Sequence, residues 1–391
     1  MKRVFALVSL LVIVSLLAGC GPTPEPTKPQ PTAEAAKPTE AAKPTEAAKP
    51  TEPAKLGPVT LWTKFNDENP QNTQDEWLKA MLAAIKTDVG LEMTNVFVPF
   101  DQINTKLNLA VQAGGDIPDV SYVDTQNLGF FFANGTLMDL TDFVKAAPWY
   151  GSVNPGALRA CTAPDGKIYC VPSGISGRWM YYWTAAFPDG FPKTTDELLA
   201  LAPDLKAQGK YAVTFQVTAM EGLPFSLIKS YGGKLGDEKG LVAWASPETV
   251  KAVEVLRTLF AEGYAPDVDM APGFEFETPF KDGSSGSFFA GSWSYVYLNP
   301  LTSFDGKSFD LQAASVEEAL KAGALSTAAP LAAPGGAPYS ALQATAWAIP
   351  VGAQNVEGAK AFLNYQMGDA TRNADFAFGF GALPSLNEAL A

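Results

Sequence analysis

Apolar and polar positions recur with two different periods along the first part of the sequence. The apolar run Val59–Thr63 predicts a short strand, and apolar residues three and four apart between Trp77 and Ile85 predict a helix with one apolar face. The pattern then repeats with a strand, a helix and a buried strand, at Met93–Val98, Gln102–Gln112 and Val120–Val123. This β-α-β-α-β order favours a mostly parallel sheet flanked by helices, with the loops at the carboxyl ends of the strands as the ligand edge.

A second set of elements follows after residue 190. Thr194 and Glu197 form a capping-box pattern that predicts a helix reaching Gln208, and Ser246-Pro247 predicts the start of another helix that ends near Gly263. The other predicted elements are strands at Ala212–Val217 and Thr345–Pro350, a strand with an aromatic turn from Phe288 to Tyr295, and a helix at Asn355–Met367. The segment Ala324–Tyr339, rich in Pro, Gly and Ala, predicts a connector that crosses between two lobes.

The stretch Ala163–Trp183 is the predicted hinge between these two sets. Asp165-Gly166 fits a two-residue hairpin turn, and symmetric pairing about that turn sets Cys161 opposite Cys170. Their Cα atoms would then be about 4.5 Å apart, which is compatible with a disulfide. Pro164 cannot donate a ladder hydrogen bond, so a wider turn with a different register stays open.

The second half of the hinge stretch is rich in aromatic residues and has two interpretations. Tyr181 and Trp183 share one face of an alternating strand, which is typical of residues buried in a core. Arg178 and Trp179 could instead lie at the lip of a cleft between the lobes, where ligands are commonly held.

The N-terminus has the pattern of a targeting signal. Lys2-Arg3 precedes the apolar run Val4–Leu17, which is followed by Leu17-Ala18-Gly19-Cys20. This resembles a bacterial lipoprotein signal, which implies that residues 1–19 are removed and that Cys20 carries a lipid. A transmembrane anchor is the alternative, but a run of about 14 residues is shorter than the roughly 20 that a span requires. The protein is therefore expected at the outer face of the cytoplasmic membrane, or in the periplasm of a two-membrane cell.

Residues 20–57 contain repeats of A-A-K-P-T-E with closely spaced prolines, which predicts a disordered tether. Such a tether suits docking on a membrane partner, and it suits equally a spacer through a cell wall. With Cys20 lipidated, two cysteines remain in an oxidising compartment, which agrees with a Cys161–Cys170 disulfide.

Composition excludes several kinds of chemistry. The chain has no histidine, which removes Ser-His-Asp catalysis and His-ligated zinc or haem, and its net charge of −13 makes nucleic acid an unsuitable partner. There is no phosphate-loop spacing at Gly232–Lys234 and no D-x-D-x-D-G calcium loop, so we expect neither cofactor nor metal. Glu275 and Glu277 could act as an acid–base pair if extended, but a solvated strand edge is the preferred interpretation.

Aromatic and polar residues gather instead near predicted strand ends. Four tryptophans have this setting, at positions Trp62, Trp179, Trp293 and Trp347. Sugars offer apolar faces that stack on aromatic rings and hydroxyls that bind charged side chains, so this combination favours a carbohydrate ligand. A tryptophan taken singly is more often a core residue than a ligand platform, and it is the recurrence of four in this setting that favours a ligand site.

The order of motifs resembles the extracellular solute-binding proteins of carbohydrate ABC importers, the maltose-binding-protein-like group. The matching stretches are Val59–Thr63, Gly114–Val120, Asn134–Asp142, Asp165–Pro172, Pro192–Leu198, Ser246–Ala252, Ala290–Ser294 and Ala346–Pro350. The resemblance implies an α/β, two-lobed periplasmic-binding-protein-like fold of type II. Each lobe is expected to be a mostly parallel sheet flanked by helices, and crossover hinge strands join the two.

The resemblance also implies lobe boundaries, a ligand site and partners. The first lobe is expected at residues 58–171 plus 340–375, and the second at 172–339 plus 376–391. The implied ligand contacts are Trp62, Asn66, Glu68, Asp124, Arg178, Trp179, Trp293 and Trp347. The expected protein is a monomer that binds a sugar or oligosaccharide, closes on it and delivers it to the permease subunits of an ABC transporter.

Two departures from the family pattern and two rival functions belong to this interpretation. The segment between Trp183 and Pro192 is shorter than usual, and the sequence ends at Ala391, where relatives continue through further helices of the second lobe. If those helices are absent, the list of ligand contacts is incomplete. The rival functions are a surface-anchored carbohydrate-active enzyme and a sugar-sensing or adhesion lipoprotein with the same fold.

Overall fold

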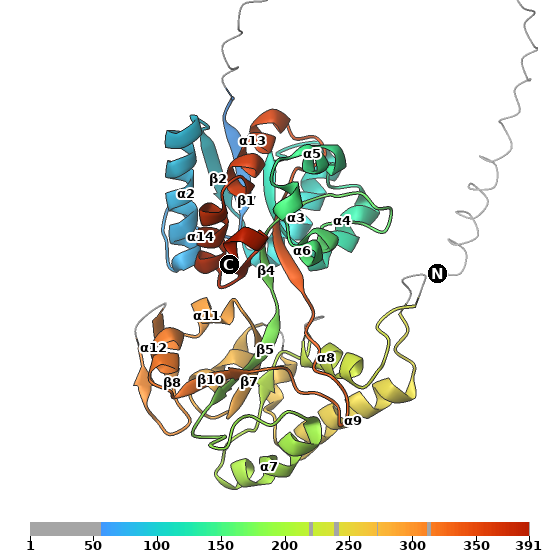
Figure 1. The fold of residues 1–391 in the computed structure, drawn as a ribbon, viewed down its shortest axis with the longest axis vertical. Helices are drawn as coiled ribbons and strands as arrows, with labels where there is room; N and C mark the ends of the chain where they lie inside the picture. The colour runs from blue at the N-terminus through green and yellow to red at the C-terminus, as the bar shows by residue number, and fades with distance from the viewer. Residues whose placement is uncertain (1–55, 219–221, 238–241, 272, 311–313, 391) are drawn as a thin grey trace, which may run out of the picture. The chain divides into compact units, whose positions relative to one another are not determined.

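The structure is a computed structural model that describes residues 56–218, 222–237, 242–271, 273–310 and 314–390. Cys20, the signal segment and nearly all of the predicted tether lie outside these residues. The described chain folds into two lobes, each with its own sheet and hydrophobic core (Figure 1).

The first lobe has a six-stranded sheet in the order β12-β4-β11-β3-β1-β2. Its strands are β1 (Val59–Thr63), β2 (Met93–Phe97), β3 (Val120–Asp124), β4 (Val171–Ser176), β11 (Gln343–Ala348) and β12 (Leu383–Pro384). β1 is parallel to β2 and β3, as predicted, but β11 is antiparallel to β3 and β4, and β12 is antiparallel to β4. The prediction of a mostly parallel sheet is therefore wrong here, because half of the strands enter from the hinge and the C-terminal segment.

Seven helices accompany this sheet in the described residues. They are α2 (Thr73–Val89), α3 (Phe100–Ala113), α4 (Leu128–Asn134), α5 (Thr141–Ala146), α6 (Pro155–Ala160), α13 (Val356–Met367) and α14 (Ala370–Phe380). α2 begins where the side chain of Asn72 accepts hydrogen bonds from the N–H groups of Gln74 and Asp75. It ends at Gly90, whose φ of 67° is a left-handed conformation that suits glycine.

The second lobe has a four-stranded sheet in the order β10-β5-β7-β6. Its strands are β5 (Arg178–Trp183), β6 (Thr214–Phe215), β7 (Ser287–Gly291) and β10 (Leu325–Ala328), and a separate ribbon pairs β8 (Leu301–Thr302) with β9 (Ser308–Phe309). Only β6 and β7 are parallel, so the expectation of a mostly parallel sheet is wrong for this lobe too. β6 is shorter than predicted, and β10 lies within the segment predicted as a connector.

The helices of the second lobe follow the predicted start signals. They are α7 (Thr195–Ala207), α8 (Leu223–Ser230), α9 (Pro247–Ala261), α10 (Thr278–Lys281), α11 (Ser294–Tyr297) and α12 (Ser315–Lys321). The capping box at Thr194 and Glu197 is present, and the Ser246 side chain caps α9 by accepting from the N–H of Thr249. Both predicted helix starts are confirmed.

β5 is buried on both of its faces. Met180 and Tyr182 pack into one apolar cluster of the second lobe, and Tyr181 and Trp183 pack into another. The indole N–H of Trp183, which is fully buried, donates to the carbonyl of Phe280 at 3.3 Å. The interpretation of Tyr181 and Trp183 as core residues is therefore correct.

The chain crosses between the lobes at Gly177 and returns near Ser340. β4 belongs to the first sheet and runs on into β5 of the second, while the returning segment leads into β11 (Figure 1). The two crossings are joined, because the N–H of Arg178 donates to Oγ of Ser340 at 2.8 Å. The predicted boundary after residue 171 is therefore several residues too early.

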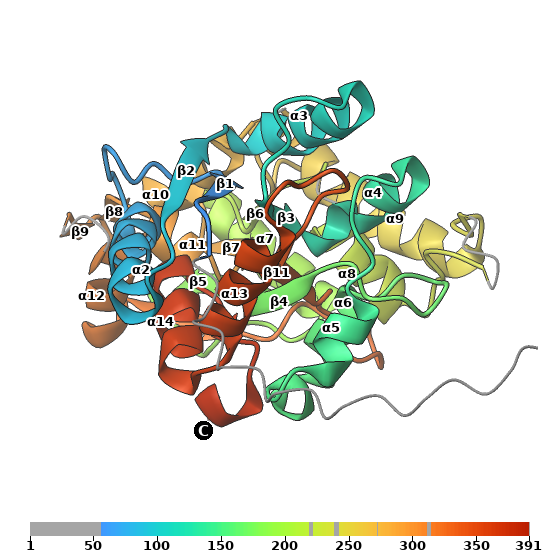
Figure 2. The same ribbon diagram turned by 90° about the horizontal axis from the view of Figure 1, so that it is seen from above.

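The C-terminal segment belongs to the first lobe. α14 packs against α2 and β4 (Figures 1 and 2), and β12 adds an edge to the first sheet beside β4. Asn373 holds this arrangement, since its amide donates to the carbonyl of Ser173 at 2.9 Å and its Oδ1 accepts from the N–H of Ser385 at 2.9 Å. The assignment of residues 376–391 to the second lobe is wrong. Apolar spacing predicts that a segment is a helix but does not indicate which sheet it covers.

Cys161 and Cys170 are joined by a disulfide, with their Cα atoms 5.2 Å apart. The hairpin around them has a different register from the symmetric one, because Thr162 pairs with Ile168 and the N–H of Ala163 donates to the carbonyl of Lys167. The turn is therefore wider than two residues, which is the alternative that Pro164 left open.

Candidate functional site

A half-buried lysine, Lys64, follows the first strand of the first lobe. Its ammonium nitrogen lies within 6 Å of four ring centroids, those of Phe65 (5.7 Å), Phe100 (4.8 Å), Tyr122 (5.4 Å) and Phe380 (5.7 Å). Burial lowers the pKa of Lys64, and the carboxylates of Asp124 and Asp75 act in the opposite direction. The ammonium group of Lys64 therefore lies among aromatic faces at the carboxyl end of β1.

Asp124 occupies the equivalent place at the end of β3. Its carboxylate is buried and accepts a hydrogen bond from the hydroxyl of Tyr122 at 2.7 Å. Burial raises the pKa of Tyr122, and the charge of Asp124 raises it further, so the phenol stays protonated and keeps donating. Parallel β1 and β3 end at the same edge of the sheet, which brings Lys64 and Asp124 together.

The loop between β1 and α2 is held by Asp75. Its two carboxylate oxygens accept from the N–H groups of Asn66 and Gln71, each at 2.9 Å. Asn66 in turn accepts from the N–H of Asn69 through Oδ1, and Glu68 is exposed at the tip of the loop. This loop is therefore fixed before any ligand arrives.

Tyr297 of α11 reaches this group from the second lobe. Its hydroxyl donates to Oε1 of Gln74, in the first turn of α2, at 2.7 Å. Burial raises the pKa of Tyr297, and the carboxylates of Asp75, Glu277 and Asp124 raise it further. These charges act on one phenol, so acidic groups from both lobes converge around it.

A hollow of about 940 Å³ lies beside Tyr297, between the two lobes. It is lined by the start of α2, by α11 and by the end of α14, including Asn72, Trp77, Asn299 and Phe378. Amide groups, carboxylates and aromatic rings thus share one space, which is the mixture that a ligand with both hydroxyls and apolar faces requires.

Arg178 and Trp293 meet at the hinge. The guanidinium of Arg178 lies 4.7 Å from the centroid of the Trp293 ring, and the same ring covers Gly291, where a Cβ would come within 2.3 Å of it. Trp179 instead packs its ring against Tyr181 within the second lobe. The guanidinium of Arg178 thus lies over the ring of Trp293, which was also among the predicted ligand contacts.

Two of the predicted ligand contacts are core residues. Trp347 is fully buried in the first lobe, where its ring contacts Trp77, Tyr122, Phe362 and Phe376. It lies at the centre of a sheet covered on that face by helices, so the prediction that it contacts a ligand is wrong.

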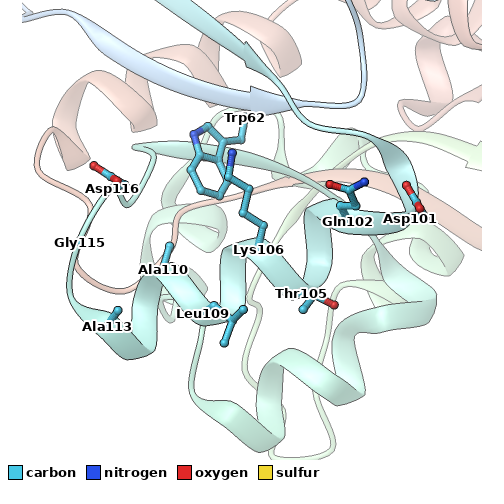
Figure 3. Close-up of a pocket in the computed structure, with 10 residues that line it drawn as sticks. All are labelled: Trp62, Asp101, Gln102, Thr105, Lys106, Leu109, Ala110, Ala113, Gly115 and Asp116. Carbon is cyan, nitrogen blue, oxygen red and sulfur yellow. The ribbon is translucent and has the colours of Figure 1, made fainter.

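Trp62 is 4 % exposed, and its ring lies beneath Lys106 of α3, whose ammonium is 4.4 Å from the ring centroid (Figure 3). This ring borders a separate groove of about 630 Å³ along α3 (Figure 3). Trp62 and Lys64 are only two positions apart, but the chain leaves β1 between them, and only Lys64 joins the strand-end group. Trp62 therefore lies apart from the strand-end group and borders the groove along α3 instead.

Sequence reasoning missed Lys64, Tyr122 and Tyr297. Lys64 could have been found, because it directly follows a predicted strand whose end was identified as the ligand edge. Tyr297 could not, since its place depends on how α11 packs against α2.

Other kinds of site are not evident in the described residues. No three acidic or cysteine side chains among them are arranged to hold a metal ion, and no helix among them has the length and apolarity needed to cross a membrane. Glu275 and Glu277 lie in the short 3-10 helix η4 (Glu275–Glu277), so the strand-edge interpretation of this pair is wrong.

Comparison with known proteins agrees with this architecture. Residues 80–391 match the family of bacterial extracellular solute-binding proteins. The chain belongs to this family. No curated protein sequence matches the chain. As predicted, this solute-binding protein is a binding component and not an enzyme.

Solved structures of similar fold include sugar-binding proteins. The GacH receptor of Streptomyces glaucescens GLA.O, solved without ligand and with acarbose, has 20% identity and a TM-score of 0.68 over 85% of this chain and 80% of its own. MalE3 of T. maritima with maltose has 22% identity and a TM-score of 0.67 over 85% and 82%. An ABC transporter solute-binding protein of Thermotoga lettingae TMO with α-D-tagatose has 21% identity and a TM-score of 0.69, also over 85% and 82%. These likenesses confirm the two-lobed fold.

Proposed function

We propose that this solute-binding protein binds a sugar or short oligosaccharide between its lobes and delivers it to the permease of an ABC importer. The observation that carries the proposal is the group formed by Lys64, Asp124 and Tyr297, which draws polar side chains from both lobes into one aromatic setting. The ligands named for the similar structures, acarbose, maltose and α-D-tagatose, are all rich in hydroxyls.

The chemistry of the group suits such a ligand. Charged side chains make stronger hydrogen bonds to hydroxyls than neutral ones, and Lys64 and Asp124 supply a donor and an acceptor side by side. Aromatic faces such as Trp293 pack against the C–H faces of a sugar ring. We assign Lys64, Asp124, Arg178 and Trp293 to the main contacts, with Asn66, Glu68 and Trp179 as further contacts.

The lobes are proposed to move as two bodies. The first comprises residues 58–176 and 340–390, and the second comprises residues 177–339. Ligand would favour the closed arrangement because it contacts both walls, and closure would present a joint surface to the permease. One chain supplies both walls, so the protein is proposed to act as a monomer.

Membrane attachment completes the proposal. Cys20 is proposed to carry a lipid on the outer face of the cytoplasmic membrane, and residues 20–57 to act as the tether. Mass spectrometry of the protein purified from membranes would test this, with Cys20→Ala expected to release the protein into the soluble fraction.

A ligand screen tests the binding function. The chain from residue 20, carrying Cys20→Ala, would be mixed with mono-, di- and oligosaccharides and with polyols, and its thermal unfolding followed. A ligand that binds the folded state should raise the Tm in a concentration-dependent way. Calorimetry would confirm each hit, and Asp124→Asn should weaken it, while Asp139→Asn, on the surface of the same lobe, should not. A broad panel without any hit would contradict a sugar ligand.

A further inference from the structure

A carboxyl group is buried in the second lobe, outside the group just described. Asp269 lies in the 3-10 helix η3 (Asp267–Met270) and is fully buried. Its Oδ2 accepts from the N–H of Phe215 at 3.1 Å, and its Oδ1 lies 2.5 Å from Oγ1 of Thr214. The side chain thus ties η3 to strand β6.

Counting protons around Thr214 shows the state of this carboxyl. Oγ1 of Thr214 lies 2.5 Å from Oδ1 of Asp269 and 2.7 Å from the carbonyl oxygen of Phe276. A hydroxyl has one proton to donate, and a carbonyl oxygen can only accept. If Thr214 donates to Phe276, the short contact to Asp269 is a hydrogen bond only when the carboxyl itself carries the donated proton.

Asp139 in the first lobe provides the opposite case. Its Oδ1 also lies 2.5 Å from a threonine hydroxyl, that of Thr141, but the second partner of this hydroxyl is the N–H of Ile168, which donates to it. Thr141 is then free to donate to the carboxylate, and hydrogen bonds from Thr141 lower the pKa of Asp139. Two Asp–Thr pairs with the same spacing therefore require different proton counts.

We propose that Asp269 is held as a neutral carboxylic acid and acts as a positioning residue, fixing through Thr214 the helix η4 that carries Glu277 toward Tyr297. The chain of contacts runs from Asp269 to the hydroxyl of Thr214, and from there to the carbonyl of Phe276. The effect of Asp269 on ligand binding rests on the proposed function, whereas the protonation state of Asp269 does not.

The electrostatic surroundings of Asp269 in the second lobe agree with a neutral carboxyl group. Burial raises the pKa of Asp269 to about 8, while its contacts with Thr214 and Phe215 act in the opposite direction, and no charged group among the described residues shifts it. Glu277 of η4, next to Phe276, also has a shifted pKa. Burial raises the pKa of Glu277 to about 7, and the charge of Lys281 opposes this change. The charge of Glu277 in turn contributes to the raised pKa of Tyr297.

The sign of the pH dependence follows from these values. An unfolded aspartate loses its proton near pH 3.8, whereas folded Asp269 keeps it until about pH 8. Between these limits the folded state binds one more proton, so its stability falls as pH rises, and above about pH 8 the fall stops. Above about pH 8 the ionised Oδ1 competes with Phe276 for the proton of Thr214, and η4 loosens.

Asp269→Asn is the decisive variant. The amide of asparagine can donate to Thr214 and accept from Phe215, so it reproduces the protonated acid at every pH. Unfolding by denaturant would be measured from pH 4 to pH 10 for the chain from residue 20 carrying Cys20→Ala, and for the same chain with Asp269→Asn. The ratio of the unfolding constant of the parent chain to that of Asp269→Asn should rise by about tenfold per pH unit between about pH 4 and 8. Above about pH 8 this ratio should stay constant. Glu277 is common to both chains and cancels.

Asp139→Asn is the matched control. Asp139 is ionised in both the folded and the unfolded state above about pH 5, so the difference between this variant and the parent should be flat from pH 5 to 8. An Asp269→Asn variant that is destabilised at pH 7 and keeps the parent's pH dependence would mean that Asp269 is ionised, and would overturn the proposal.

Hydrogen exchange tests the positioning role without a ligand. The N–H of Glu277 donates to the carbonyl of Phe274, the residue that precedes η4. Its protection, corrected for the intrinsic pH dependence, should fall between pH 7 and pH 9 in the parent chain and stay constant in Asp269→Asn. Equal protection in both chains would refute the positioning role. Because neither measurement uses a sugar, these outcomes are independent of whether the proposed ligand binds.

Discussion

Trp347 and Trp293 occupy two contrasting regions of the molecule. Trp347 lies in the core of the first lobe, fully buried and surrounded by rings. Trp293 lies at the hinge and is partly exposed. The guanidinium of Arg178 lies over its ring, and the backbone of Gly381 lies close to the backbone of Trp293. Both follow or end a strand in sequence, yet only the second borders both lobes. A tryptophan near a strand end is therefore a ligand candidate only when its face of the sheet lacks a covering helix.

The largest expected effect is on the core side of this comparison. Trp347→Ala should destabilise the protein by about 3–5 kcal/mol, because it removes a fully buried ring and leaves a cavity among aromatic neighbours. Chemical denaturation would measure the change. A stability loss below about 1 kcal/mol, with loss of ligand binding instead, would reverse the comparison.

A smaller effect, of a different kind, is expected at the hinge. Trp293→Ala should weaken binding of a sugar found in the screen by about 10- to 100-fold, or ~1.4–2.8 kcal/mol, since it removes the proposed stacking surface and the partner of Arg178. Calorimetry would give the affinity. Far-ultraviolet circular dichroism and the Tm would show whether the fold is kept, and a variant that unfolds would identify Trp293 as a structural residue only.

The bond between the lobes should have a modest effect. Tyr297→Phe removes the hydroxyl that donates to Gln74. It should destabilise the arrangement in which the two lobes are in contact by about 0.5–1.5 kcal/mol. Small-angle scattering without ligand should then report a larger radius of gyration, and sugar affinity should fall by up to about tenfold. An unchanged radius would mean that this bond does not hold the lobes together.

The smallest effect is expected at the tip of the loop after β1. Glu68 is exposed at the tip of this loop, so Glu68→Gln should alter sugar affinity by less than about threefold and stability by less than about 0.5 kcal/mol. Calorimetry on Glu68→Gln beside Trp293→Ala would measure this. A larger loss of affinity would extend the contact region onto this loop.

Local features of the structure could be predicted from the sequence. The strands β1 and β3, the capping box at Thr194 and the pairing of Cys161 with Cys170 all depend on residues close to one another in the chain. The same applies to Asp124, which was found as the residue after a buried strand.

Features that depend on distant pairings could not be predicted. β11 and β12 join the first sheet beside β4 from positions more than 150 residues later in the chain, so no local pattern indicates their direction. The burial of Trp347 follows from that placement, because α13 and α14 then cover its face. The position of Tyr297 could not be predicted for the same reason, because it depends on the contact of α11 with α2.

The return of the C-terminal segment to the first lobe determines which half of the molecule is attached. Leu56 packs on the core of the first lobe, and the last described residues lie beside β4 and β12 in the same lobe. Both ends of the described chain thus lie in one half, and the backbone passes to the other half at Gly177 and returns at Ser340. If Cys20 is fixed at a membrane, the tether restrains the first lobe alone, and the second lobe stays free to rotate about the hinge.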